Sequence, residues 1–290
     1  MVRIVLKRND AAQFLLEVPA TSTIEEILEL SCEIYNGFLK IHRICAEMDD
    51  LAKHGVSLPP NMQGLTDDQI VDLKLKDEWG EKCIPSGGYI ECKDEIGRRN
   101  GRAPNEKMAQ VLKRTIDETK QLIKRDLVKQ DKCMDKATVK EALMMLQGAV
   151  MIVYPMGLPP HDPIKLELDN EEDLTGTHAA QEVVPFEEAT LWFSGKEMLR
   201  GKLLSDYVGK NEKTKIVAKL SKRGAGAPAR EPIIDEEQQK AMMSYYYKKQ
   251  EEWKKLESND EDAYLDSAWA EPGQLKRQFH GLTNIKWGPR

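Results

Sequence analysis

The chain has 290 residues, of which 40% are apolar and 32% charged, and 43 basic residues against 49 acidic ones give a net charge of −6. This composition predicts a soluble globular protein and is too apolar for wholesale disorder. A mildly acidic chain has no general attraction for nucleic acid or for an anionic membrane, so neither is expected as a partner. No apolar run is long enough for a transmembrane helix. Charges at Lys7, Arg8 and Asp10 argue against a signal peptide.

The five cysteines are predicted to be reduced thiols, some of them packed as small apolar side chains. They are Cys32, Cys45, Cys83, Cys92 and Cys133. Their number is odd, and the sequence contains no Cys-x-x-Cys pair and no His/Cys spacing typical of a zinc site. We therefore expect no metal and no other cofactor.

The N-terminal part is predicted to form a β-hairpin followed by two helices. Apolar residues alternate over 2–7, a turn at Asn9-Asp10 follows, and a second apolar run ends before Pro19. A helix is expected over 24–35, beginning with a capping box at Ser22 or Thr23, and Asn36-Gly37 is expected to end it. A further amphipathic helix is predicted over 41–52. A hairpin followed by a helix is how a β-grasp fold begins.

The middle of the chain is predicted to be helical. Residues 96–104 are basic and rich in glycine and proline, which indicates a domain boundary. The basic residues of Arg98–Arg102 are expected to lie in a solvated loop or to contact an acidic protein partner. RNA binding is less favoured, because no aromatic residue lies between them to stack on bases. Apolar spacing predicts a helix over 108–123 and a shorter one over 136–147.

From Gly148 onward the pattern favours strands. The apolar run 149–154 is short and is followed by Pro155, so we expect a buried central strand there. Alternation over 164–168 predicts a half-exposed partner strand. Further strands are expected over 189–193 and 214–220, with a helical turn at 203–207 between them.

Residues Thr190 to Gly224, TLWFSGKEMLRGKLLSDYVGKNEKTKIVAKLSKRG, resemble the second half of ubiquitin. The resemblance covers a strand ending in a Gly-Lys turn, a Leu-Ser-Asp-Tyr turn and a closing strand before a basic tail. The chain continues past Gly224 instead of ending in Gly-Gly. A ubiquitin-like binding module is therefore favoured over a conjugated modifier. As a shuttle for ubiquitin receptors, it would bind through the exposed face of strands 191–193 and 216–220.

A last helix is predicted over residues 236–257. Its Met242, Met243, Tyr246, Tyr247 and Trp253 are expected to pack in the core, and a peptide-binding groove is the alternative. The tail beyond it lacks periodicity but carries aromatic residues spaced like interface anchors. The candidate partner-binding residues are Trp192, Lys210 and Lys213 in the ubiquitin-like segment and Trp269, Phe279 and Trp287 in the tail.

An enzyme is the alternative, centred on a thiol at Cys83 or on a nucleotide loop at Gly209-Lys210. No histidine near Cys83 could act as its base, and the residues around Gly209 fail the phosphate-loop spacing. Cys83→Ser and Lys210→Ala would abolish function in an enzyme and spare it in a binding protein. We expect no catalytic residue and no small-molecule substrate.

The predicted fold class is α+β, divided into four parts. They are an N-terminal ββα head with a helical extension (1–100), a helical middle (104–147), a ubiquitin-like β-grasp module (148–224) and a C-terminal helix with an aromatic tail (230–290). The sequence leaves open whether the hairpin and the ubiquitin-like strands share one sheet.

The whole chain resembles the Kurly family of cilia- and flagella-associated proteins. Its motifs include LPPNMQGLTDDQI, LKLKDEWGEKC, IGRRNGRAPNEKM, GAVMIVYPMGLPP, LSDYVGKNEKTKI and RGAGAPAREPI. The resemblance implies a non-enzymatic cytoplasmic factor, associated with the cilium or its base, that helps to preassemble axonemal dynein arms. Its implied partners are dynein chains, chaperones and other assembly factors, with a further link to cilium orientation and planar cell polarity.

Overall fold

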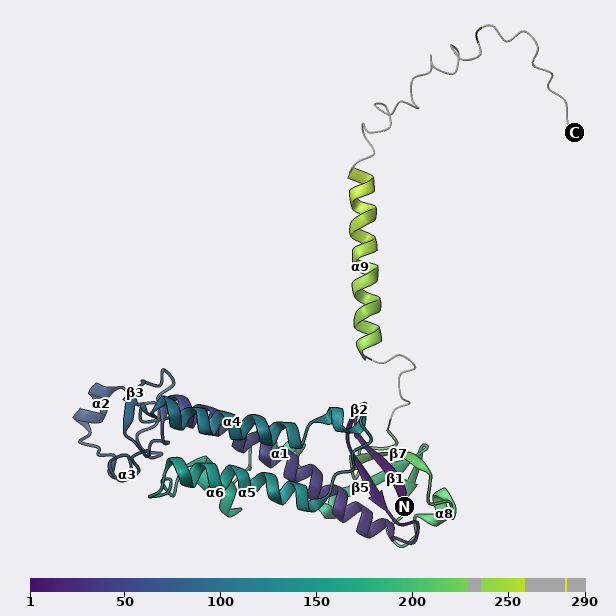
Figure 1. Cartoon of the computed structure of the whole chain (residues 1–290), viewed down its shortest axis with the longest axis horizontal. Coiled ribbons are helices and arrows are strands. Elements are labelled where there is room, and N and C mark those ends of the chain that lie inside the picture. Colours follow the sequence, from purple (N-terminus) through teal and green to yellow (C-terminus); the bar gives the residue numbers. More distant parts are fainter. Residues whose placement is uncertain (229–235, 259–279, 281–290) are drawn as a thin grey trace, which may run out of the picture. The chain divides into compact units, whose positions relative to one another are not determined.

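The computed structural model describes residues 1–228, 236–258 and 280 and has an α+β fold (Figure 1). The chain divides into two compact units, Met1–Arg230 and Glu231–Arg290, and each is described by itself. The strands are β1 (Val2–Arg8), β2 (Ala11–Val18), β3 (Tyr89–Glu91), β4 (Arg102–Pro104), β5 (Ala189–Phe193), β6 (Lys196–Met198) and β7 (Lys215–Lys222).

The helices of the first unit are α1 (Ile24–His54), α2 (Asp67–Asp72), α3 (Glu78–Lys82), α4 (Glu106–Leu122), α5 (Lys136–Val153), α6 (Pro163–Asp169), α7 (His178–Glu182) and α8 (Ser205–Val208). Two 3₁₀ helices are η1 (Arg125–Val128) and η2 (Phe186–Glu188). The second unit contains α9 (Glu236–Ser258). The predicted helices at 108–123 and 236–257 and the strands at 189–193 and 214–220 are confirmed.

The hairpin and the ubiquitin-like strands form one sheet. Its strand order is β2-β1-β7-β5-β6. β1 pairs with β7 in parallel, from Arg3 opposite Lys215 to Lys7 opposite Lys219, and the other neighbours are antiparallel. The sheet therefore joins the two ends of the first unit, and residues 148–224 supply only part of it. The long segment between α1 and β5 is an insertion into this β-grasp arrangement.

Helix α1 is one continuous helix, so the predicted break at Asn36-Gly37 is wrong. Its start is confirmed as a capping box, in which the Glu26 N–H donates to Thr23 Oγ1 at 3.2 Å and the Thr23 N–H donates to the Glu26 carboxylate at 3.1 Å. Asn36 uses its side-chain amide to bond both backbone groups of Val184, at 2.8 and 3.0 Å. Gly37 lies where a Cβ would come within 2.5 Å of Val139 Cγ1. Both residues therefore serve packing, although their types are common at a helix end.

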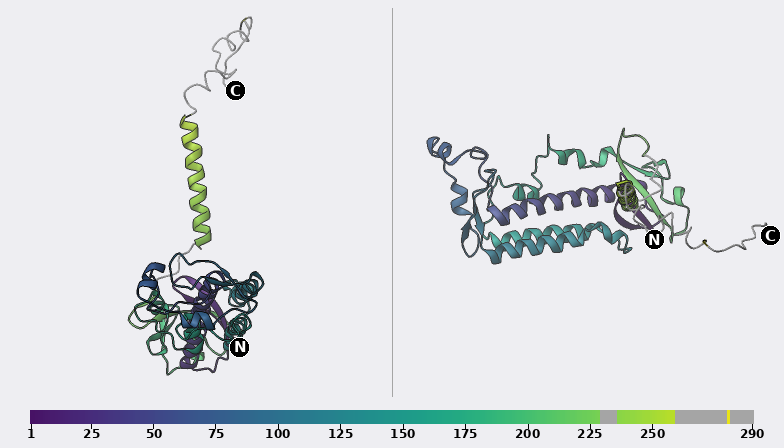
Figure 2. Two further views of the ribbon diagram at one scale, coloured as in Figure 1. Left: turned by 90° about the vertical axis from the view of Figure 1, so that its left-hand side faces the viewer. Right: turned by 90° about the horizontal axis from the view of Figure 1, so that it is seen from above.

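Helices α1, α4 and α5 lie side by side and extend away from the sheet (Figures 1 and 2). The predicted strand at 149–154 is wrong, because these residues complete α5 and its cap. Ala149, Val150 and Val153 are buried on the side that continues the apolar stripe of Ala142 and Leu146. A short apolar run does not by itself distinguish a strand from a buried helix segment. Here the helical spacing of the buried residues continues from 142 to 153, so the run forms part of the helix.

The predicted strand at 164–168 is also wrong, because these residues form α6. Asp162 caps this helix, since its Oδ1 accepts the Ile164 N–H at 3.0 Å, and Pro163 stands in the first turn. Proline there has a φ angle already suited to a helix and lacks only an N–H that would go unpaired. The local capping geometry therefore outweighs the alternating pattern.

The expected solvated basic loop at Arg98–Arg102 is corrected at Arg99, which is buried. Its guanidinium donates to the Gly55 carbonyl at 2.8 Å and to the Glu47 carboxylate at 2.6 Å, and it lies 3.9 Å from Asp162 Oδ2. The Ser57 N–H donates to the same Asp162 oxygen at 3.0 Å. This buried ionic cluster ties the end of α1 to the start of α6.

Tyr154 is buried next to this cluster, and its hydroxyl has no hydrogen-bond partner in the structure. Burial raises the pKa of Tyr154 and the charge of Asp162 raises it further, so the phenol stays protonated. Tyr154→Phe removes the unpaired group and keeps the ring. We expect the variant to be equally stable or up to about 1 kcal/mol more stable in urea denaturation. A loss of more than about 1 kcal/mol would show that the hydroxyl has a partner in solution.

Candidate functional site: an exposed methionine face on helix α5

Helix α5 is apolar on two opposite sides, and only one of them is buried. The buried side consists of Val139, Ala142, Leu146, Ala149, Val150 and Val153. On the other side Met144 is 63% exposed, and Met151 and Ile152 are each 60% exposed. A helix that is apolar all round is normally covered on every side. The exposed side of α5 therefore lacks a cover within the first unit, Met1–Arg230.

We define the methionine face as Met144, Gly148, Met151 and Ile152. At about 100° per residue, these four positions fall within roughly 100° of one another on the helix. Met156, 77% exposed, follows just beyond the end of α5. Contiguous exposed apolar side chains of this kind mark interaction sites, and methionine adapts readily to the shape of a partner.

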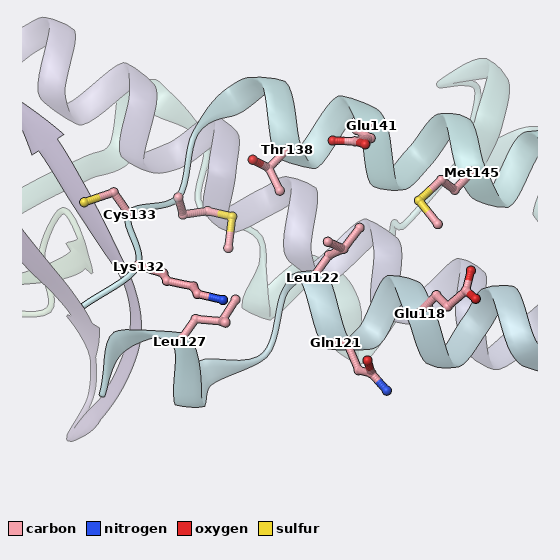
Figure 3. Close-up of a pocket in the computed structure, with 10 residues that line it drawn as sticks. Glu118, Gln121, Leu122, Leu127, Lys132, Cys133, Thr138, Glu141 and Met145 are labelled. Atoms are coloured by element: carbon pink, nitrogen blue, oxygen red, sulfur yellow. The ribbon is translucent and has the colours of Figure 1, made fainter. Parts of the chain in front are cut away.

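A groove lies between α4 and α5 (Figure 3). It has a volume of about 590 Å³, and Met145, next to Met144 in α5, is part of its lining. Leu122, Leu127 and Met134 contribute further apolar side chains. The remaining lining residues are Glu118, Gln121, Lys132, Cys133, Thr138 and Glu141.

The groove carries two carboxylates from facing helices, Glu118 on α4 and Glu141 on α5 (Figure 3). Glu118 accepts a hydrogen bond from Arg114 Nε at 2.8 Å, but both side chains are exposed, so this pair contributes little to stability. Burial, followed by the charge of Glu17, raises the pKa of the Cys133 thiol. Cys133 is therefore a protonated, weakly polar lining residue at neutral pH.

The structure places the predicted partner-binding residues on separate elements. Trp192 lies on β5, half-buried, and its indole N–H donates to the Thr190 hydroxyl at 3.3 Å. Lys210 and Lys213 are exposed in the loop between α8 and β7. Trp269, Phe279 and Trp287 lie outside the described residues.

The two positions of the enzyme alternative lack the surroundings that it needs. Cys83 is buried, and burial followed by the charge of Asp77 raises the pKa of its thiol, whereas an activated thiol needs a lowered pKa. Gly209 caps the C-terminal end of α8, whereas phosphates bind at helix N-termini. In the described ranges, no group of three or more His, Cys, Asp or Glu residues could hold a metal ion.

Within the second unit the aromatic side of α9 is exposed and does not pack in a core of that unit. Met242, Tyr246 and Trp253 are exposed, as are Met243 and Tyr247. The Lys249 ammonium lies over the rings of Tyr245 and Trp253, at 6.0 and 5.8 Å from their centroids. Cation–π contacts of this kind contribute about 0.5–1 kcal/mol at exposed sites.

Sequence reasoning missed the methionine face because it assigned 149–154 to a strand. The signal was present, since Met144, Gly148, Met151 and Ile152 follow one another at the spacing i, i+4, i+7 and i+8. That spacing defines one side of a helix. These residues form a second apolar stripe on the side opposite the buried stripe. Two such stripes indicate a helix that is covered on more than one side.

The sheet order, the hairpin and the long helix that follows it define the chain as a β-grasp protein with a helical insertion. Comparisons with known proteins give the family. The family described as Cilia- and flagella-associated protein 298 matches residues 189–285. Proteins of that name from Danio rerio and Homo sapiens are 62% and 61% identical to the chain over the full length of both. One from Drosophila melanogaster is 48% identical over 99% of each.

The chain belongs to the cilia- and flagella-associated protein 298 family. The family supports a cilium-related role and confirms the cilium association that the sequence resemblance implied. The name Kurly does not occur among these relatives. No solved structure matches the chain. Within residues 1–228 and 236–258, no helix is both long and apolar enough to cross a bilayer.

Proposed function

We propose that this protein is a non-enzymatic adaptor that binds other proteins during the assembly of axonemal dynein arms for motile cilia. Dynein chains, chaperones and other assembly factors are its proposed partners. It would act in the cytoplasm, with an association at the cilium or its base, and contribute to cilium orientation and planar cell polarity. The cilium-related family supports this role, and one structural observation carries the adaptor function.

That observation is the exposed methionine face of α5 beside the α4–α5 groove. Met144, Met151 and Ile152 each leave more than half of their surface in water although they belong to a core helix. Covering such side chains with a partner is favourable by about 1.5–3 kcal/mol for each one fully buried. A surface of this type holds a polypeptide, and its neighbouring groove gives side chains of that polypeptide a place to insert.

Replacing Met144 and Met151 together with glutamine is expected to reduce the recovery of dynein-arm proteins and assembly factors at least tenfold. Each position is exposed, so folding stability should change by less than about 0.5 kcal/mol. Affinity purification of the full-length variant from ciliating cells, read by quantitative mass spectrometry, measures the effect. Met144→Leu with Met151→Leu is the matched control, because it keeps both apolar side chains and should keep the partners.

Undiminished recovery by the glutamine variant would remove the methionine face from the adaptor function. The enzyme alternative is tested in the same cells by Cys83→Ser and Lys210→Ala. The adaptor proposal expects both variants to restore ciliary motility in cells lacking the protein. Loss of motility with a stable, partner-bound Cys83→Ser or Lys210→Ala protein would favour the enzyme.

A further inference from the structure

We propose that the segment covering the methionine face is an amphipathic α-helix of a partner protein, which crosses α5 at Gly148 and brings a lysine or arginine side chain to Glu118 and Glu141. This inference rests on the proposed adaptor function and specifies the chemistry of the partner. Three observations carry it: an unexplained glycine, the dimensions of the face, and two carboxylates at its border.

Gly148 stands inside helix α5, where glycine destabilises a helix relative to alanine by about 0.5–1 kcal/mol. A Cβ at Gly148 would meet no atom within 4 Å. Packing within the first unit therefore does not require glycine here. Gly37 in α1 is the contrast, because a Cβ there would collide with Val139.

Gly148 lies between Met144 and Ile152, one turn from each, so it forms a gap in the middle of the apolar face. Helices pack at axial distances of about 8–10 Å, and small side chains at the crossing point allow the shorter distances. Nothing within the first unit explains this glycine, and a second backbone that approaches the face would account for it.

The dimensions of the face fit a helix. Met144 and Ile152 are eight residues apart, which corresponds to about 12 Å along α5 at 1.5 Å per residue. A helix with its side chains is about 10–12 Å wide. The methionine face presents side chains and no sheet edge, so a strand would gain no main-chain hydrogen bonds there. A helix crossing at Gly148 would place its own apolar residues between Met144 and Ile152.

The charges next to the face favour a basic residue on that helix. Glu118, Glu141 and Lys132 line the same groove as Met145 (Figure 3), so its carboxylates outnumber its ammonium group by two to one. Glu141 is exposed, and Glu118 pairs with the exposed Arg114. A lysine or arginine reaching into the groove would lie near both carboxylates and could bond either of them. Two carboxylates at the border also oppose an anionic lipid surface.

The test uses full-length protein and designed 18-residue helical peptides with leucine on one side, alanine at its centre and a single lysine about one turn away. Fluorescence anisotropy should show at least tenfold weaker binding when that lysine is replaced by glutamate, and weaker binding when the central alanine is replaced by leucine. In the protein, Glu118→Lys with Glu141→Lys should reverse the preference between the lysine and glutamate peptides. Equal binding of all peptides, or binding of none, overturns the proposal.

Gly148 is tested by substitutions that separate stability from binding. Gly148→Ala should raise the melting temperature by about 2–4 °C, as expected for a helix-stabilising change in a domain of this size. It should nevertheless weaken peptide binding several-fold, and Gly148→Leu should reduce it at least twentyfold. Gln147→Ala, at the neighbouring exposed position, is the matched control and should leave binding unchanged. Unchanged binding by Gly148→Leu overturns the crossing point.

A lipid surface or a second copy of the chain on the methionine face would give different results in binding experiments. The protein could instead bind phosphatidylserine–phosphatidylcholine vesicles and lose that binding in the double variant Met144→Gln with Met151→Gln. This result would identify a lipid surface as the occupant and overturn the proposal. Self-association in sedimentation that is lost in the same variant would identify a second copy and overturn it as well. Met144→Gln with Met151→Gln could lose dynein-arm proteins while Gly148→Leu and Glu118→Lys with Glu141→Lys keep them. In that case the adaptor function stands and the proposed crossing helix is wrong.

Discussion

Replacing Arg99 with methionine is expected to destabilise the protein by about 3–5 kcal/mol, because it leaves a buried carboxylate without its positive partner. Asp162 is fully buried, and the Arg99 guanidinium lies 3.9 Å from it while also bonding Glu47 and Gly55. Methionine keeps an unbranched apolar side chain but has none of the five donors. Urea denaturation of the full-length variant at pH 7 measures the loss.

The pH dependence of this loss follows from the pKa of Asp162. Burial raises the pKa of Asp162, and the charge of Arg99 lowers it again in part. A carboxyl whose pKa is raised by folding binds its proton more tightly in the folded state. Its contribution is favourable below its unfolded pKa of about 3.9 and is lost as the pH rises through the folded pKa. Without Arg99 the folded pKa rises further, so the deficit of Arg99→Met should be smallest in acid and grow toward neutral pH.

Asp162→Asn in the Arg99→Met background is the control for this explanation. The amide removes the buried charge, so the double variant should recover part of the loss at pH 7 and show a flatter pH profile. A loss of less than about 1 kcal/mol in Arg99→Met, or a deficit that is the same at pH 4.5 and pH 7, would contradict the buried ion pair.

Elements with strong local signals could be predicted from the sequence. The capping box of Thr23 and Glu26 begins α1, the apolar stripe of 108–123 forms α4, and alternation over 189–193 and 214–220 gives two strands. These signals act between residues a few positions apart. The free state of all five cysteines also agrees with the prediction, and Cys32, Cys45 and Cys83 are buried as expected for small apolar side chains.

The errors arose where distant partners decide the structure. Asn36 extends α1 because it bonds Val184, far along the chain, and the sequence near Asn36 contains no sign of that bond. In the sequence Arg99 is one of several charges in a basic segment. In the structure it lies next to Glu47 and Asp162, which come from distant parts of the chain. The run 149–154 is apolar enough for a central strand, but the inner places of the sheet belong to β1, β7 and β5. Tertiary contacts of this kind override local pattern.

The candidate site was only partly within reach of sequence reasoning. The expectation of protein-binding surfaces directed attention to aromatic residues, whereas the structure adds an aliphatic, sulfur-rich face on α5. Recognising that face required the knowledge that Met144, Gly148 and Ile152 share one side of a helix whose other side is buried. The sequence gives the spacing, but only the packing of α5 on α1 and α4 shows which side remains uncovered.

Removing residues 1–18 is expected to abolish cooperative folding of the first unit. β1 occupies an inner place in the sheet, between β2 and β7, and Ile4, Leu6, Phe14 and Leu16 are buried in the core. Burial of each such side chain contributes about 1.5–3 kcal/mol, and four of them together approach the 5–15 kcal/mol that stabilises a typical domain. Far-ultraviolet circular dichroism and urea denaturation of 19–290 against 1–290 measure the effect.

The fragment 148–230 provides the complementary measurement, because it contains the ubiquitin-like strands without the hairpin. β7 would lose its parallel neighbour β1 along the register from Arg3–Lys215 to Lys7–Lys219, and its exposed edge would have to be covered in another way. We expect this fragment to be unfolded alone and the fragment 1–230 to unfold cooperatively. A synthetic peptide of residues 1–18 should restore structure to 19–290 if the hairpin completes the sheet. Cooperative unfolding of 148–230 by itself would show that the C-terminal strands fold independently of the hairpin.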